Sequence, residues 1–124
     1  MTLVDTSVWV DHFRSRSKVL EQLLRDSEVL VHPFVVGELA LGRIKNRQEI
    51  MDLLANLPEI EVAEHREVIH LVESRNLGGS GIGWIDAHLV CSAMIAHARL
   101  LTADKELLKA ARSLGIAATA IPRA

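Results

Sequence analysis

Leu3-Val4-Asp5-Thr6-Ser7 is the stretch that decides the fold, because an acid stands where a short apolar run ends. Residues 2–5 predict a buried strand, and Thr6 or Ser7 predicts the cap of a helix that runs to about Arg14. Carboxylates are rarely buried unless they are paired or bind a metal. Asp5 therefore indicates a functional position at the end of a core strand.

Apolar runs of strand length alternate with helical patterns along the rest of the chain. Further strands are predicted at residues 28–31, 60–62, 99–102 and 116–121. Helices are predicted at residues 17–26, 33–44, 47–56, 64–75, 84–97 and 105–114. Strands that alternate with helices predict an α/β fold with a mainly parallel sheet. We expect one domain over residues 1–124, because no linker or repeat divides the chain.

The composition is that of a globular protein, with 49% hydrophobic and 24% charged residues. A formal net charge of −2 argues against binding nucleic acid through bulk charge, although it leaves room for a local basic patch. No apolar run has the length of a membrane span, and we see no signal peptide. Cys91 is the one cysteine, which excludes an internal disulfide and suits the cytoplasm, where we expect the protein.

Three more acids stand in positions like that of Asp5. Asp104 comes just after the predicted strand 99–102, Asp86 lies in the first turn of a predicted helix, and Glu38 lies about one and a half turns into another. Parallel sheets bind ligands beyond the carboxyl ends of their strands, so the four acids are expected to meet at one edge. Clustered carboxylates repel one another unless a cation neutralises them, and their oxygens suit Mg²⁺ or Mn²⁺ rather than Zn²⁺. The sequence therefore predicts a divalent-metal site in a phosphodiester-cleaving enzyme.

Each acid also has a simpler structural explanation. Asp5 and Asp104 would serve as helix N-caps, and Asp86 would favour the positive end of its helix. Glu38 resists this explanation because apolar residues flank it, and a charge on an apolar helix needs a partner. Each of the four acids follows a predicted strand or lies near the start of a predicted helix. This common pattern favours one shared metal site over four separate structural roles.

Four short motifs carry a resemblance to a known family. They are Asp5-Thr6-Ser7, Glu38-Leu39 with Gly42-Arg43, Asp86-Ala87-His88-Leu89-Val90-Cys91-Ser92-Ala93 and Leu101-Thr102-Ala103-Asp104. In this order and spacing the chain resembles the PIN-domain ribonucleases, and among them the VapC-type toxins of toxin–antitoxin pairs. The resemblance implies a five-stranded parallel sheet flanked by helices on both sides, Mg²⁺ or Mn²⁺ at the acids, and cleavage of RNA such as tRNA or rRNA. It also implies a homodimer and a cognate VapB-type antitoxin that covers the site.

The acids have distinct roles in this hypothesis, and all four are candidate catalytic residues. Asp5 and Asp86 are expected to bind the metal directly, and Asp104 to bind it or to support a ligand. Glu38 is expected to bind the metal or to orient the attacking water. Hydroxyl groups next to the acids are expected to donate hydrogen bonds to them, at Thr6, Ser7 and Thr102.

Two basic runs, residues 14–18 and 43–47, follow helices that carry or adjoin these acids. Such runs are usually solvated helix ends, but here they suit a grip on RNA phosphates equally well. Arg14, Arg43 and Lys45 are the expected RNA-binding residues.

Aromatic side chains suggest further contacts. Trp84, next to the acid at position 86, is expected either to stack on a base or to be buried at a dimer contact. An apolar segment of the antitoxin is expected in a groove between the early helices, near Trp9, Phe13 and Leu41.

Two alternative functions remain open. A receiver-like signalling domain has a similar length, a parallel sheet and a Mg²⁺-binding acid cluster, but it needs an aspartate after its middle strand and a lysine after its last. Here Pro122-Arg123-Ala124 follows the last predicted strand, which argues against this alternative. The second alternative is a PIN scaffold that binds without cleaving, and the presence of all four acids argues against it.

Overall fold

A computed structural model describes residues 1–121 and places four strands in one parallel sheet. They are β1 (Thr2–Val4), β2 (Val29–Leu30), β3 (Arg99–Thr102) and β4 (Ala118–Ala120), in the spatial order β2-β1-β3-β4. Leu3 pairs with Leu30 on one side and with Leu100 on the other. Because all the pairs are parallel, the carboxyl ends of β1 and β3 lie side by side at one edge of the sheet. The last three residues of the predicted domain 1–124 lie outside the described residues.

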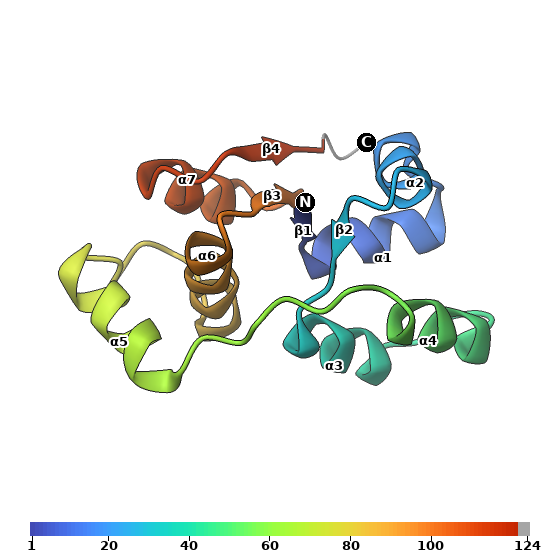
Figure 1. Cartoon of the computed structure of the whole chain (residues 1–124), viewed down its shortest axis with the longest axis horizontal. Helices are drawn as coiled ribbons and strands as arrows, with labels where there is room; N and C mark the ends of the chain where they lie inside the picture. Colours follow the sequence, from blue (N-terminus) through green and yellow to red (C-terminus); the bar gives the residue numbers. More distant parts are fainter. Residues whose placement is uncertain (122–124) are drawn as a thin grey trace.

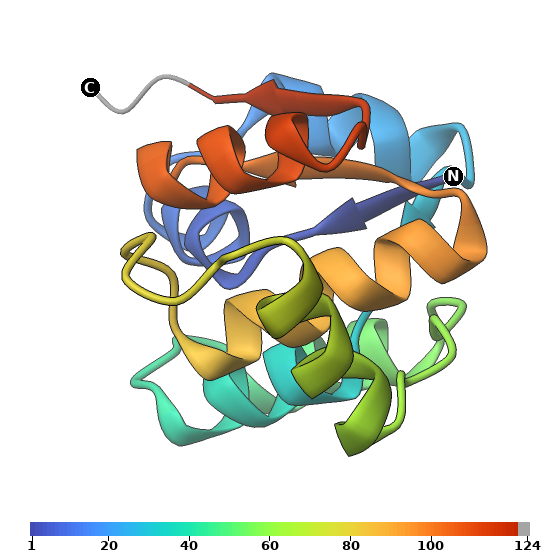
Figure 2. The ribbon, with the colours of Figure 1, turned by 90° about the vertical axis from the view of Figure 1, so that its left-hand side faces the viewer.

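Seven helices surround the sheet in the described part of the chain. They are α1 (Thr6–Arg14), α2 (Lys18–Arg25), α3 (Pro33–Leu41), α4 (Arg47–Ala55), α5 (His65–Ser74), α6 (Trp84–Ala96) and α7 (Lys105–Ser113). Figure 1 shows α1 and α2 on one side of the sheet and α6 and α7 on the other, with α5 outside α6. In Figure 2, α5 lies in front of α6, and α3 lies toward the bottom of the view. The predicted α/β fold, with a parallel sheet and helices on both sides, is confirmed.

The prediction of a fifth strand at residues 60–62 is wrong, since the described sheet has four strands. In that region an isolated bridge joins Val31 to Glu59. The bridge is made by two backbone hydrogen bonds of 2.9 Å, from Val31 N–H to Pro58 O and from Ile60 N–H to Val31 O. Ile60 is buried but the next two residues are exposed, so one apolar anchor fixes the segment without extending it into a strand.

The core lies between the central strands and the inner faces of the helices. Leu3, Val4, Leu100 and Leu101 are all buried, as expected for parallel strands that helices cover on both faces. Trp9 of α1 is also fully buried. Within residues 1–121 no helix is both long and apolar enough to cross a membrane.

The helix that carries Glu38 is three residues shorter than predicted, because α3 ends at Leu41. Gly42 has an extended backbone, with φ −80° and ψ 170°, and thereby ends the helix. The Arg47 guanidinium donates to the carbonyl oxygens of Ala40 and Gly42, which ties the following loop back to the helix end. The basic loop between α3 and α4 is therefore held close to the end of the site-bearing helix.

Candidate active site at the carboxyl edge of the sheet

The structure brings the four predicted acids to the carboxyl edge of the sheet. Asp5 directly follows β1, and Asp104 begins α7 just after β3. Asp86 is the third residue of α6, and Glu38 lies on α3, which packs against α1. We call these four residues the acid cluster. Its members come from four separate segments of the chain, as the positions of the acids in the sequence predict.

Asp86 experiences the charge of all three other members of the acid cluster. Burial raises the pKa of Asp86 to about 6, and repulsion from Asp5 adds to the rise. Asp104 and Glu38 raise this pKa further, whereas the hydrogen bond from the Gly83 N–H lowers it. A strongly shifted carboxyl group among like charges is typical of a functional site.

Asp5 is held in place by two hydroxyl groups. Ser7 and Thr102 both donate to Oδ2 of Asp5, each over 2.7 Å. The Ser7 hydroxyl in turn accepts the backbone N–H of Ala103 at 3.1 Å. The Thr102 hydroxyl accepts the backbone N–H of Asp104 at 3.0 Å. Since each hydroxyl oxygen receives a backbone donor, its own hydrogen is directed at the carboxylate.

Glu38 and Asp86 are each fixed through one oxygen. Oε1 of Glu38 accepts the hydroxyl of Thr6 at 2.8 Å. Oδ2 of Asp86 accepts the N–H of Gly83 at 3.4 Å, across the start of α6. Glu38 is exposed, so its apolar sequence neighbours do not enclose it, and its partner is a hydroxyl of α1. The expected hydrogen bonds from all three hydroxyl residues to the acids are present.

Helix capping explains one acid and fails for another. Oδ1 of Asp104 caps α7 by accepting two N–H groups of its first turn, at 2.8 and 3.2 Å. Asp5 occupies the N-cap position of α1, but its side chain makes no capping bond. The predicted cap at Thr6 or Ser7 is wrong, because both residues lie inside α1 and their hydroxyls donate to acids instead.

The oxygens left over in the acid cluster decide what it can bind. In each acid one carboxylate oxygen accepts the hydrogen bonds given above. The other oxygen accepts no hydrogen bond from residues 1–121. Four such carboxylate oxygens suit a hard cation such as Mg²⁺ or Mn²⁺. Within the described residues, no three Asp, Glu, His or Cys side chains are arranged to hold one ion as they stand. Repulsion of about 3 kcal/mol for a pair ~6 Å apart at a dielectric of ~20 opposes closer approach, so a bound ion would draw the oxygens together.

The predicted RNA-binding residues differ from their basic neighbours. Arg14, Arg43 and Lys45 are exposed and form no ion pair with any residue in the described range. Arg16, in contrast, forms an ion pair of 2.8 Å with a glutamate of α2. Arg47 is used by the end of α3. The three predicted residues therefore keep their cationic groups available for a ligand.

Sequence reasoning missed a cluster of rings beside the acids. The ring of His88 lies 4.9 Å from that of Trp84, 4.8 Å from that of Phe34 and 6.2 Å from that of His32. Burial lowers the pKa of His32 to about 4, with His88 as a second cause, and burial also lowers the pKa of His88. Both imidazoles are therefore neutral packing groups near pH 7. The spacing of Trp84 and His88, four residues apart on one predicted helix, is the signal that could have revealed their contact.

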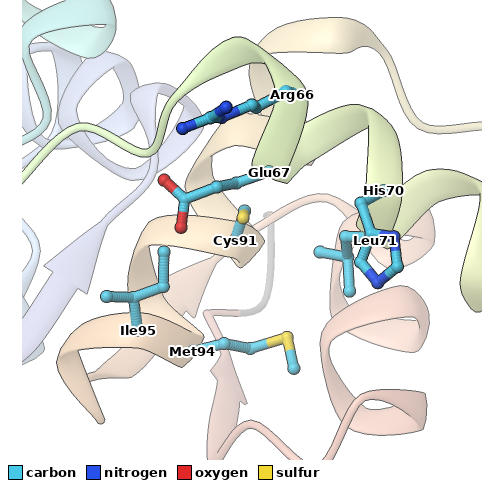
Figure 3. A pocket seen from close by; sticks show the side chains of 7 residues that line it. All are labelled: Arg66, Glu67, His70, Leu71, Cys91, Met94 and Ile95. Atoms are coloured by element: carbon cyan, nitrogen blue, oxygen red, sulfur yellow. The ribbon is translucent and has the colours of Figure 1, made fainter.

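A cavity of about 430 Å³ lies away from the acid cluster, between α5 and α6 (Figure 3). Its lining is mostly apolar and includes Leu71, Cys91, Met94 and Ile95. Polar side chains such as Glu67 also line it. Burial and the charge of Glu67 raise the pKa of the Cys91 thiol, which keeps it protonated and a poor nucleophile. Cys91 is therefore a packing residue, as its apolar helical setting predicts.

Comparison with known proteins identifies the family. The sequence model of the PIN-domain family matches residues 2–113 of this chain. The chain belongs to the PIN-domain family. Ribonuclease VapC32 of Mycobacterium tuberculosis, from strains CDC 1551 / Oshkosh and H37Rv, is 49% identical over 118 residues, which cover 94% of this chain and 95% of the relative. The resemblance to VapC-type PIN domains is thereby confirmed, and the receiver-like alternative is wrong.

Solved structures share the fold of this PIN domain at low sequence identity. PAE2754 from Pyrobaculum aerophilum is similar with a TM-score of 0.64 and 18% identity, over 87% of this chain and 82% of that one. A toxin–antitoxin complex from Klebsiella pneumoniae gives 0.64 and 17%, over 84% and 87%. FitAB bound to a DNA fragment gives 0.64 and 14%, over 97% and 94%. These likenesses establish the fold alone.

The hydroxyl of Thr102 is expected to matter for both stability and activity. In Thr102→Val the buried carboxylate of Asp5 loses one of two donors and the N–H of Asp104 loses its acceptor, which should cost about 1–3 kcal/mol of unfolding free energy. If Asp5 binds a metal as the sequence predicts, RNA cleavage should fall about 10- to 100-fold, the loss typical for groups that orient a metal ligand. Denaturant unfolding and cleavage rates measure both effects, with Thr102→Ser as the control that keeps the hydroxyl. Equal behaviour of the Val and Ser variants would contradict the proposed role.

Proposed function

We propose that this PIN domain is an endoribonuclease that acts as the toxin of a toxin–antitoxin pair. The observation that carries the proposal is the acid cluster, in which Asp5, Glu38 and Asp104 all raise the pKa of Asp86. Such an assembly of negative charge disfavours direct contact with a polyanion, unless a cation mediates it. The 49% identity to a ribonuclease over nearly the whole chain supports RNA as the substrate.

The cofactor that we propose is Mg²⁺ or Mn²⁺. Asp5, Asp86 and Asp104 would hold it through the oxygens that make no hydrogen bond within the described chain. When bound, such an ion polarises a phosphoryl oxygen and lowers the pKa of water. The hydroxyl pair on Asp5 fixes one carboxylate before any ligand arrives, which lowers the cost of organising the site.

Glu38 is the residue that we propose to orient the attacking water. Its carboxylate is exposed, and the Thr6 hydroxyl holds one of its oxygens at 2.8 Å. The other oxygen is left to accept a hydrogen bond from a water molecule. Because the pKa of Asp86 is raised by burial and by its acidic neighbours, a cation at Asp86 would favour its ionised form at neutral pH.

RNA phosphates are proposed to bind at the exposed ends of α1 and α3. The acid cluster repels phosphates, so attraction must come from Arg14, Arg43 and Lys45 together with the metal. Both helices start near the acid cluster or carry one of its members, and they lead to these cations. The proposed phosphate-binding residues therefore lie to one side of the acid cluster, where the RNA is proposed to be cleaved.

Reversing the charge of Arg43 is expected to weaken RNA cleavage and flatten its salt dependence. Arg43→Glu should remove about one phosphate contact, so the slope of log K against log salt should become less steep by about 0.7 for single-stranded RNA. Cleavage rates at several salt concentrations measure the slope. Arg99→Glu is the matched control, since Arg99 is exposed at the opposite edge of the sheet. Parallel slopes for both variants and the wild type would mean that residues 43–47 are only a solvated loop.

The antitoxin is proposed to cover the acid cluster with a basic side chain. An arginine or lysine among the four carboxylates would replace the charge of the metal. The expected apolar contact needs one correction, because Trp9 is fully buried and cannot touch a partner. Leu41, at the end of α3, is 91% exposed and is the apolar residue that we propose for this contact. We also propose that the protein is a cytoplasmic homodimer.

Incubation with purified tRNA and rRNA tests the function directly. We expect cleavage at discrete positions that requires Mg²⁺ or Mn²⁺ and is suppressed by the antitoxin. An Asp86→Asn preparation, purified in the same way, controls for contaminating nucleases. RNA left intact under all metal conditions would contradict the proposal and favour the alternative of a binding scaffold.

A further inference from the structure

Trp84 combines exposure with a fixed position. It is the first residue of α6, and its indole lies 5.0 Å from the ring of His65 and 4.9 Å from that of His88. His88 is buried and packs on Phe34, so it anchors the indole to the interior. Trp84 nevertheless remains 41% exposed, whereas the other tryptophan of the chain has no exposed surface.

The indole lies at the start of the helix turn that carries Asp86. Residues two positions apart on a helix point in different directions, so Trp84 and Asp86 face different sides of the start of α6. Trp84 faces α5 through His65, and Asp86 faces the acid cluster. A chain that crosses the start of α6 can therefore place one group at the acids and a neighbouring group on the indole.

The charge of the acid cluster indicates what that neighbouring group is. The cations proposed to bind phosphates lie at the ends of α1 and α3, so the nucleotide next to the four carboxylates gains little from phosphate contacts. Base stacking on an aromatic ring is independent of charge and works for every base. A rigid ring also loses little conformational freedom on binding, because its neighbours already restrict it.

We infer that Trp84, supported by His65 and His88, is a stacking platform for an unpaired RNA base next to the bond that the acid cluster cleaves. The inference rests on the proposed ribonuclease function. It assigns Trp84 a role in positioning the substrate rather than in the chemistry. An unpaired base is required, since a base inside a helix has no free face.

Binding of a random-sequence pool of oligoribonucleotides, about ten nucleotides long, tests the inference. The Asp86→Asn background keeps the RNA intact, and Trp84→Ala, Trp84→Phe and Leu53→Ala are compared in it. We expect Trp84→Ala to weaken binding by about 5- to 150-fold and Trp84→Phe to retain most of the affinity. Leu53→Ala is the matched control, because Leu53 on α4 is 40% exposed and should not affect binding. Circular dichroism verifies the fold of each variant.

Tryptophan fluorescence gives a second readout. RNA should quench the emission of the Asp86→Asn protein, and the quenching should disappear in Trp84→Phe because only the buried Trp9 remains. No RNA binding, equal binding by the Trp84→Ala and Leu53→Ala variants, or quenching that survives in Trp84→Phe would overturn the inference. So would a change in Trp84 emission with protein concentration alone, which would mean that a second copy covers the ring.

Cleavage by the protein with an intact Asp86 separates this inference from the proposed function. If the wild type cleaves RNA, Trp84→Ala raises KM and Trp84→Phe has a KM near that of the wild type, the stacking platform and the ribonuclease function are both supported. If Trp84→Ala cleaves with the same KM as the wild type, the stacking platform is refuted and the ribonuclease remains. If the wild type cleaves nothing, the ribonuclease is refuted, whatever the binding measurements show.

Discussion

Asp86→Asn is expected to lower RNA cleavage by about 100- to 1,000-fold, the loss typical when one charge-stabilising group is removed from an active site. Asparagine has nearly the same shape and can still accept the Gly83 N–H, so the start of α6 should be unchanged. Only the negative charge is lost, and the proposed metal-assisted hydrolysis depends on it. Rates of RNA cleavage at saturating Mg²⁺ measure the effect.

The same substitution is expected to stabilise the metal-free protein at neutral pH. The pKa of Asp86 rises from 3.8 to about 6 on folding, so between these values the folded state holds a proton that the unfolded state has released. The contribution of Asp86 to stability therefore falls as the pH rises through this window. We expect the gain from Asp86→Asn to grow from near zero at pH 4 to about 1–2 kcal/mol at pH 7, after allowance for solvent screening. Thermal unfolding in chelator from pH 4 to pH 7 measures it.

Asp52→Asn is the matched control for both effects, because Asp52 is an exposed aspartate on α4, outside the acid cluster. It should change neither cleavage nor the pH dependence of stability. Asp5→Asn and Glu38→Gln should reduce cleavage as strongly as Asp86→Asn. Asp104→Asn should do less, because Asp104 is the acid expected to support a ligand as an alternative to binding the metal, and asparagine can still cap α7. Wild-type turnover in two of the three strong variants would show that the site has been assigned wrongly.

Removal of divalent metal is expected to abolish cleavage completely and reversibly. EDTA should inactivate the protein, and Mg²⁺ or Mn²⁺ should restore it, while Ca²⁺ should bind without full turnover because its coordination is looser. An ion that binds only the folded state stabilises it by about 2.7 kcal/mol at one hundred times its Kd. Thermal unfolding with and without Mg²⁺ measures this, and most of the shift should vanish in Asp86→Asn. Full cleavage in excess chelator would contradict the metal mechanism.

The sequence predicted the acid cluster because strand ends and first turns of helices are local features. Asp5 and Asp104 could be placed at one edge once their strands were known to be parallel. The hydroxyls of Thr6, Ser7 and Thr102 were also predicted as donors to the acids. The backbone N–H groups that orient two of these hydroxyls were not predicted, since they depend on how the loop after β3 folds over β1.

Other features depended on tertiary contacts that periodicity does not reveal. Residues 60–62 have an apolar pattern, but one buried side chain does not make a strand. The run of cations at residues 43–47 looks uniform, although Arg47 is occupied by the end of α3 and Arg43 is not. The contact of Trp84 with His65 likewise depends on how α5 packs against α6, and the sequence pattern does not reveal it.

The hydrogen bond between Asp5 and Thr102 can form only late in the synthesis of the chain on the ribosome. The two partners are 97 positions apart, so the carboxylate is made long before the hydroxyl that fixes it. At about 5–20 residues per second, roughly 5 to 20 seconds separate them. During that interval the acid cluster is incomplete, because Asp104 and the hydroxyl that fixes Asp5 have not been made. A ribonuclease whose acid cluster is completed only by residues 102–104, as in the proposed function, cannot act until that part of the chain has emerged from the ribosome.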